Sequence, residues 1–110
     1  MANARIVLTT VGLMEKAEAL ASALVERRLA ACVNIVGPIR SIYRWKDAIE
    51  REQEYLLLIK TTAERAADLA ATFSELHPYD LPERVEFNIE GGSGGYLEWL
   101  SAQVDRDTNQ

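Results

Sequence analysis

SIYRWKDAIEREQEYLLLIKTT, residues 41–62, decides how this chain folds. The part from 49 to 62 is charged in its first half and apolar in its second half. A strand that is buried on both faces has a continuous apolar run, whereas a strand surrounded by water does not. We therefore predict one strand over 49–62, with its second half in the core and its first half projecting beyond the core.

A long hairpin is predicted around this strand. Residues 46–48 form its turn, because Asp47 tolerates a left-handed backbone conformation better than most residues other than glycine. The preceding segment, 31–45, is rich in strand-forming residues on both sides of Gly37-Pro38. Proline lacks a ladder donor and glycine permits a bend, so this segment is either one kinked strand or two segments of one strand.

Two amphipathic helices and a first strand surround the hairpin in the sequence. Apolar residues recur at helical spacing over 13–28 and again over 63–76, with charged residues on the opposite side. The β-branched run 5–11 predicts a strand that ends at Gly12.

The C-terminal part of the chain is predicted to hold a last strand and a last helix. Alternation over 84–90 predicts a strand with Val85, Phe87 and Ile89 on its buried face. The segment GGSGG, 91–95, reads as a flexible hinge, in which Ser93 can cap a final helix.

This order of elements predicts an α+β fold, the ferredoxin-like βαββαβ sandwich, with an extended central hairpin and a C-terminal helix. Right-handed crossovers would place both main helices on one face of an antiparallel sheet. The chain has 110 residues, of which 48% are hydrophobic and 26% charged, which suits one globular domain over 1–110 with a core of about 5–104.

Composition also restricts the partners and the compartment. The formal net charge is −5 and there is no basic run, so we expect no nucleic acid partner. No stretch approaches the roughly 18 apolar residues of a spanning helix, so we expect no membrane insertion and a cytoplasmic location. The single cysteine, Cys32, fits a reducing compartment, and a small buried hydrophobe is favoured over a reactive thiol at this position.

Five separate blocks of the sequence are distinctive: RLAACVNI (28–35), SIYRW (41–45), EYLLLIKTT (54–62), HPYDLPE (77–83) and YLEWL (96–100). In their order and spacing, these blocks resemble the CutA family of divalent-cation tolerance proteins. The resemblance covers residues from about Ile6 to Leu100 and implies a ferredoxin-like subunit, similar to the PII signalling proteins, that assembles as a homotrimer. It also implies a role in tolerance of, or response to, divalent metal ions such as copper.

The assembly implied by the resemblance explains the overlong hairpin. A strand of that length carrying Tyr43, Trp45 and Tyr55 would expose an edge and aromatic surface on a monomer. We therefore predict that a neighbouring subunit of the homotrimer covers it.

The resemblance also implies a copper site, and the chain keeps one of its three ligand positions. The cysteine of the first strand is replaced by Thr9 and the first of two adjacent histidines by Leu76, which leaves His77. Copper sites use three or four ligands, so no cofactor is certain. A site for copper or another divalent cation stays open, in which His77 and the carboxylates of Glu54 or Glu83 from different subunits of a trimer are the ligands. The alternative is that His77 ends the helix 63–76, with a protonated imidazole at the negative helix end.

Ten residues within the matching blocks, or close to them, could line a cleft between subunits. Aromatic side chains with a few fixed polar groups are typical of ligand pockets, but they also anchor oligomer interfaces, and packing is the favoured role. The ten residues are Cys32, Asn34, Trp45, Glu54, Lys60, His77, Tyr79, Glu83, Tyr96 and Trp99.

The leading hypothesis from sequence is a non-enzymatic binding, regulatory or scaffold protein, because no catalytic constellation is apparent. Cys32 and His77 lie on different elements, and no motif brings them together as a nucleophile and a base. Two alternatives stay open. One is an enzyme of this fold that holds a small anionic substrate at the helix N-terminus after TTVG, 9–12, and the other is a PII-like small-molecule sensor.

Overall fold

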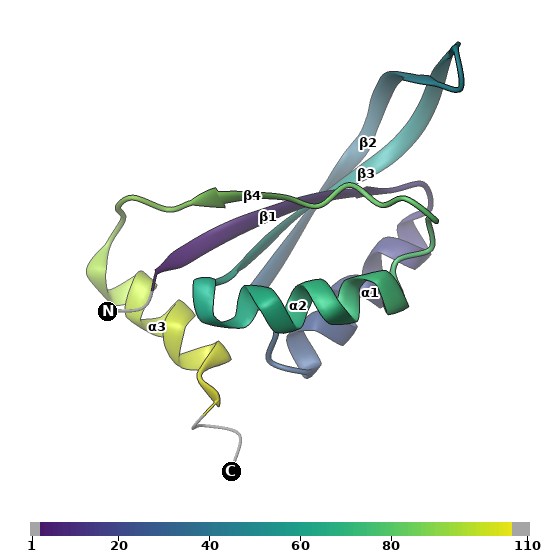
Figure 1. The fold of residues 1–110 in the computed structure, drawn as a ribbon. Helices are drawn as coiled ribbons and strands as arrows, with labels where there is room; N and C mark the ends of the chain where they lie inside the picture. The colour runs from purple at the N-terminus through teal and green to yellow at the C-terminus, as the bar shows by residue number, and fades with distance from the viewer. Residues whose placement is uncertain (1–2, 107–110) are drawn as a thin grey trace.

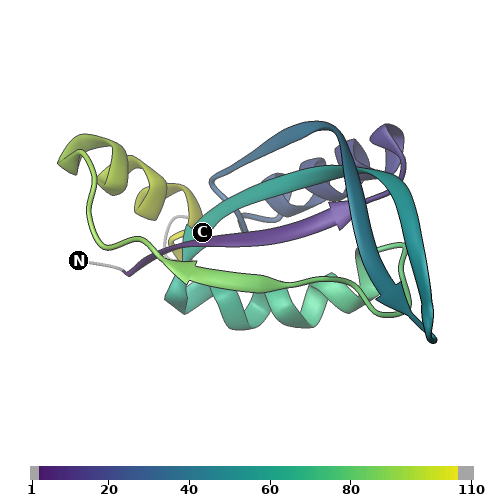
Figure 2. The same ribbon diagram turned by 90° about the horizontal axis from the view of Figure 1, so that it is seen from above.

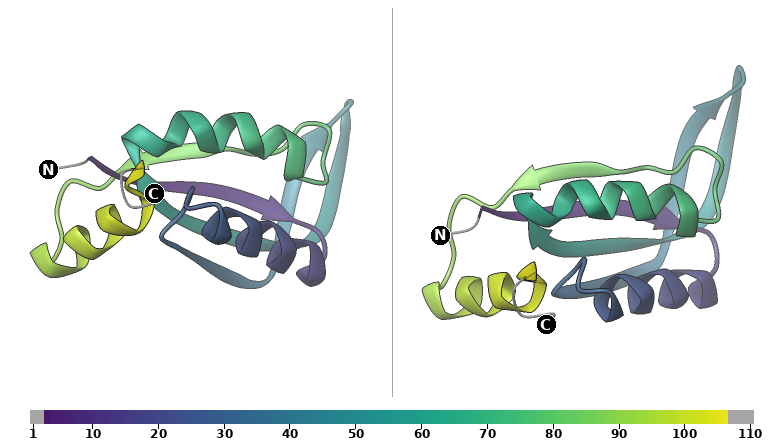
Figure 3. Two further views of the ribbon diagram at one scale, coloured as in Figure 1. Left: turned by 90° about the horizontal axis from the view of Figure 1, so that it is seen from below. Right: turned by 60° about the horizontal axis from the view of Figure 1, so that its bottom comes forward.

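The computed structural model describes residues 3–106, which form a four-stranded antiparallel sheet in the order β2-β3-β1-β4 and three helices (Figure 1). Both long helices cover the same face of the sheet, as the right-handed crossovers require (Figure 3). The predicted α+β fold is confirmed. The elements are β1 (Ala4–Val11), α1 (Met14–Glu26), β2 (Cys32–Trp45), β3 (Ala48–Thr62), α2 (Ala63–Leu76), β4 (Val85–Asn88) and α3 (Gly94–Val104).

The core lies between the sheet and the two long helices. Every second residue of β1 and of the inner half of β3 points toward the helices, which is the period expected of a strand with one covered face. Each large side chain that is fully buried there contributes roughly 1.5–3 kcal/mol to the free energy of folding. The largest of these side chains are Val7, Val11, Leu24, Leu57, Ile59, Leu69 and Phe73.

Arg65 joins the C-terminal end of α1 to the start of α2. Its Nε donates to the carbonyl oxygen of Arg28 at 3.1 Å, and its Nη1 donates to Asp68 at 2.9 Å. Arg28 itself has φ 57, the left-handed conformation that ends many helices. The helix therefore ends at Glu26, two residues before the predicted end at Arg28.

The β2–β3 hairpin extends well beyond the other two strands (Figures 1 and 2). Its turn places both Lys46 (φ 49) and Asp47 (φ 66) in the left-handed region; the prediction for Asp47 is confirmed, and the same conformation of Lys46 was not predicted. The predicted kink in β2 is a register shift between Val36 and Ile39, around a cis Gly37-Pro38 bond. A Cβ atom on Gly37 would lie 2.6 Å from Cδ2 of Tyr55, so only glycine fits this close approach.

The orientation predicted for the last strand is wrong. β4 covers only Val85–Asn88, and the side chains of Val85 and Phe87 are 44% and 52% exposed. Phe87 pairs with Ile6 and Val85 pairs with Leu8, so both point to the face of the sheet opposite the helices. Alternation identifies the strand, but the register with β1 decides which set of side chains faces the helices.

That second face of the sheet, which we call the open face, is apolar and is not covered by α1 or α2. Its residues are half-buried or exposed, although all of them are aliphatic or aromatic. Large apolar areas of this kind mark contact surfaces in soluble proteins. The open face consists of Ile6, Leu8, Val36, Leu56, Leu58, Val85 and Phe87.

The C-terminal helix α3 lies at the end of the sheet farthest from the hairpin tip (Figures 1 and 2). It buries Leu100 and Val104, and Arg28 Nη1 donates to the carbonyl oxygen of Gln103 at 3.0 Å. The helix begins at Gly94, inside the segment predicted as a hinge, and the side chain of Ser93 makes no capping hydrogen bond. Within residues 3–106, no helix is long and apolar enough to cross a membrane.

Candidate functional site

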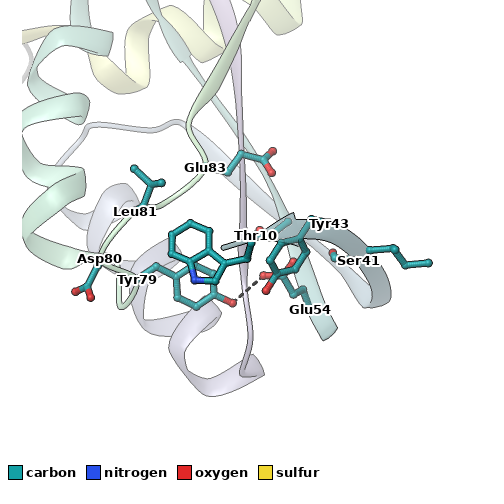
Figure 4. Close-up of a pocket in the computed structure, with 10 residues that line it drawn as sticks. Thr10, Ser41, Tyr43, Glu54, Tyr79, Asp80, Leu81 and Glu83 are labelled. Atoms are coloured by element: carbon teal, nitrogen blue, oxygen red, sulfur yellow. Dashed lines mark hydrogen bonds between the residues drawn. The ribbon is translucent and has the colours of Figure 1, made fainter. Parts of the chain in front are cut away.

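A cavity of about 680 Å³ lies between the projecting hairpin and the segment that follows α2 (Figure 4). The hairpin contributes Ser41, Ile42, Tyr43 and Trp45 from β2 and Glu54 from β3, and β1 contributes Thr10 at its end. The cavity thus forms where the hairpin leaves the sheet. Its remaining lining comes from the segment after α2, through Tyr79, Asp80, Leu81 and Glu83.

Glu54 and Tyr79 form the central polar contact of the cavity. Glu54 is only 7% exposed, and one of its carboxylate oxygens accepts a hydrogen bond from the Tyr79 hydroxyl at 2.7 Å (Figure 4). Burial raises the pKa of Tyr79, and the bond to the Glu54 carboxylate raises it further, because ionised Tyr79 would place two negative charges together. Gly12 leaves room for this hydroxyl, since a Cβ there would lie 3.1 Å from Tyr79 Oη.

His77 lies directly behind the cavity and is 6% exposed. Its Nδ1 accepts from the backbone N–H of Tyr79 at 3.1 Å, and its Nε2 lies 3.0 Å from the carbonyl oxygen of Thr10. A carbonyl oxygen can only accept, so Nε2 carries the hydrogen and the ring is neutral. The Thr9 hydroxyl, also 3.0 Å from Nε2, completes the contacts of this nitrogen.

The two predictions for His77 as a structural residue have different outcomes. The position at the end of α2 is confirmed, because His77 is the C-cap and its N–H donates to Phe73 at 2.8 Å. The prediction of a protonated ring is wrong. Burial lowers the pKa of His77, and this effect is larger than the opposing effects of the Thr10 carbonyl and the charge of Glu54, which raise the pKa. His77 therefore fixes the path of the chain from α2 to Tyr79 as a neutral hydrogen-bonding group.

Two of the three copper ligand positions implied by the resemblance, Thr9 and His77, are in contact. Thr9 contacts His77, while Leu76 packs against the core. A threonine hydroxyl is a poor copper ligand, and both nitrogens of His77 already have protein partners. Across residues 3–106 no group of three or more His, Cys, Asp or Glu side chains could hold a metal ion, so a single subunit does not fit a copper site.

The ten residues predicted for a cleft fall into two groups within one subunit. Trp45, Glu54, Tyr79 and Glu83 line the cavity, with His77 behind it. The second group lies toward the other end of the sheet, since Lys60 is six residues from Glu54 along β3, which is roughly 20 Å. That the two groups meet across subunits stays a prediction. The second group consists of Cys32, Asn34, Lys60, Tyr96 and Trp99.

The second group has its own contacts. Lys60 pairs with Cys32 in the sheet, and its Nζ lies 5.7 Å from the centre of the Tyr96 ring. The rings of Tyr96 and Trp99 are 5.5 Å apart between centres, and both side chains are more than 40% exposed. Cys32 was predicted to be buried but is half-buried, because its side chain lies on the side of the sheet that α1 and α2 do not cover.

Sequence reasoning missed six of the lining residues. Ser41 and Tyr43 could have been found, because they share one face of β2 with Trp45 at a period of two. Asp80 and Leu81 directly follow Tyr79 and could have been found by adjacency. Thr10 and Ile42 carried no signal, since only the bend of the hairpin brings them to the cavity.

Comparison with known proteins identifies similar sequences. The sequence model of the family described as "CutA1 divalent ion tolerance protein" matches residues 5–103. The chain is 50% identical over 95 residues to the divalent-cation tolerance protein CutA of Thermus thermophilus, covering 86% of this chain and 92% of that protein. It is 42% identical over 95 residues to the chloroplastic protein CutA of Arabidopsis thaliana, covering 86% of this chain but only 52% of that longer protein.

A similar solved structure has the same fold. Crystallised CutA1 of Oryza sativa superposes with a TM-score of 0.92 at 36% sequence identity, covering 96% of both chains. The four-stranded sheet with helices on one face is therefore shared with this protein.

Proposed function

Because this chain belongs to the CutA1 family of divalent-ion tolerance proteins, we propose that it acts in the response to divalent metal ions as a self-associating, non-enzymatic protein. The proposed assembly is a homotrimer, and its role is binding, regulation or scaffolding. The observation that carries this proposal is the uncovered open face of the sheet next to a projecting hairpin.

The open face supports self-association on physical grounds. Phe87 is 52% exposed, Val36 is 45% exposed and Val85 is 44% exposed, and all three point away from the helices. Covering such side chains with a second copy removes apolar surface from water, which is the main driving force of association. The exposed edges of β2 and β4 would be covered in the same step.

The charges of the hairpin support a closed ring. The register places Glu50, Glu52 and Glu54 on one face of β3 and Arg51 on the other, and Arg40 and Arg44 share the face of Arg51. A surface with opposite charges on two sides suits head-to-tail contacts between copies, and such contacts form a ring when the rotation closes. A trimer is a ring of this kind.

The non-enzymatic part of the proposal rests on His77 and Cys32, the single histidine and the single cysteine of the sequence. Neutral His77 has both ring nitrogens in hydrogen bonds, and Cys32 lies near the opposite end of the sheet. A nucleophile and its base must lie within hydrogen-bond reach, and this pair does not. Copper stays a candidate ligand only if side chains of several subunits combine.

Light scattering coupled to gel filtration tests the assembly, and native mass spectrometry with and without copper tests the metal. We expect three copies at micromolar concentration. A Phe87→Glu variant should dissociate, because it places a charge within the covered face, whereas Glu90→Gln outside that strand should leave the trimer intact. A stable wild-type monomer would contradict the proposal. Copper retained by the trimer but lost in His77→Ala would assign His77 to a shared site.

A further inference from the structure

The cavity between the hairpin and the segment after α2 has a distinct chemical character. Three aromatic side chains and three carboxylates line it, and no lysine, arginine or histidine is among its lining residues. A cavity of about 680 Å³ is within the range of small-molecule sites. Such a lining favours a ligand that is positively charged and also has apolar parts.

Glu54 is the residue of the cavity that a bound cation would stabilise most. It is 7% exposed, and its hydrogen-bond donor is the Tyr79 hydroxyl, which stays neutral at physiological pH. None of the ion pairs within residues 3–106 includes Glu54. A buried carboxylate without a cation is unfavourable, so a positively charged partner would stabilise this position.

The aromatic side chains fit an ammonium group and an aliphatic stem. Tyr43, Trp45 and Tyr79 all line the cavity, and Figure 4 shows Tyr43 and Tyr79 beside Glu54. The Trp45 ring already has an ammonium nitrogen near it, because Lys46 Nζ lies 5.9 Å from its centre. Aromatic faces attract ammonium groups, and methylene groups pack against the same rings.

We propose that this cavity binds an aliphatic diamine or polyamine. One ammonium group pairs with Glu54 at the base of the cavity, and the methylene chain packs on the aromatic side chains. A second ammonium group lies near the exposed carboxylates of Asp80 and Glu83 in the segment after α2. This ligand class goes beyond the metal-tolerance role proposed above, and it requires that the cavity stays open in the proposed homotrimer.

Isothermal titration calorimetry of the assembled wild-type protein, with a metal chelator present, tests the ligand class. Three probes of equal chain length separate charge from shape: butane-1,4-diamine, butan-1-amine and butan-1-ol. We expect the diamine to bind about tenfold more tightly than the monoamine, and the alcohol to bind more weakly than both. Equal affinities for the diamine and the alcohol would overturn the proposal. Absence of binding by the diamine would overturn it too, and would indicate that a neighbouring subunit fills the cavity.

Two matched variants locate the site. Glu54→Gln keeps the shape and the Tyr79 hydrogen bond but removes the charge, so the affinity for the diamine should fall about tenfold. Glu52→Gln makes the same change on the same strand face outside the cavity lining, and should change the affinity less than about threefold. Equal losses in both variants would indicate general attraction to an acidic surface and contradict a specific site. Because the chelator removes metal ions, loss of diamine binding and loss of a metal response are separate results.

Discussion

The inner and outer halves of β3 belong to one continuous strand but have different surroundings. In the inner half, Leu57 and Ile59 are fully buried under the helices. In the outer half, Ile49 is 47% exposed and is followed by charged side chains in the projecting hairpin. The halves meet opposite Gly37, where β2 shifts register and the hairpin leaves the sheet. The inner half therefore builds the core of the fold, whereas the outer half contributes Glu54 to the cavity and projects from the sheet with the hairpin (Figure 1).

The largest expected effect is in the inner half. Leu57→Ala should lower the free energy of unfolding by about 3 kcal/mol, because it removes a fully buried side chain and leaves a void between the sheet and the helices. Ile49→Ala is the matched change in the outer half and should cost less than about 1 kcal/mol within one subunit. Urea unfolding of both variants measures the difference. Equal costs would mean that a partner subunit buries the outer half as deeply as the core.

The junction of the two halves should be nearly as sensitive. Gly37→Ala adds a Cβ that would lie 2.6 Å from Cδ2 of Tyr55 and 3.2 Å from the backbone oxygen of Glu54, so strand β2 must move away from β3. Overpacking of this kind costs about 2 kcal/mol. Gly91→Ala is a control, because no atom lies within 4 Å of the added Cβ. Thermal unfolding that is identical for both variants would contradict the close contact at the junction.

The hydrogen bond between Tyr79 and Glu54 should contribute less. Tyr79→Phe keeps the ring and leaves Glu54 without its donor, which should cost about 1.5 kcal/mol. Tyr96→Phe is the control at the other end of the sheet, where the hydroxyl makes no hydrogen bond within residues 3–106, and it should have little effect. Denaturant unfolding at neutral pH compares the two variants. If Tyr79→Phe has no effect on stability, solvent replaces the donor and Glu54 is less enclosed than its 7% exposure indicates.

The smallest expected effect is the dependence of stability on pH through His77. Burial lowers the pKa of His77 below its unfolded value of 6.5, so the unfolded chain binds the extra proton first as the pH falls. The contribution of neutral His77 is therefore complete above about pH 6.5 and is lost as the pH falls from there toward the folded pKa. One proton limits the slope to about 1.4 kcal/mol per pH unit. Unfolding of the wild type and of His77→Gln between pH 7.5 and 5 should differ in slope, and parallel curves would contradict the neutral ring.

Sequence patterns predicted the parts of the fold that depend on local order. The change from charged to apolar residues within 49–62 located the point where the hairpin leaves the core, and Asp47 located its turn. Local order did not predict which side chains of β4 point toward the helices. Val85 and Phe87 could lie on either face of the sheet, and only the register with β1 decides between the two.

The candidate site was predictable only in part, for a similar reason. Trp45, Glu54, Tyr79 and Glu83 line one cavity within a subunit. The cleft between subunits that was expected to contain them stays a prediction. The neutral state of His77 depends on the backbone of Thr10, which is 67 residues away in the chain. No sequence pattern reports a contact of that kind, so the protonated state was the simpler expectation for a helix end.

The guanidinium group of Arg65 has a consequence for how the molecule opens. It donates to the carbonyl oxygens of Arg27 and Arg28, directly after α1, and to Asp68 within α2. Asp68 also accepts from Arg106, which follows α3, at 2.7 Å. The segment after α1 and the start of α2 thus depend on one side chain, and Asp68 links the segment after α3 to the same group. Amide hydrogens at the end of α1 and at the start of α2 should therefore become accessible to exchange in a single opening event, rather than by independent fraying of each helix.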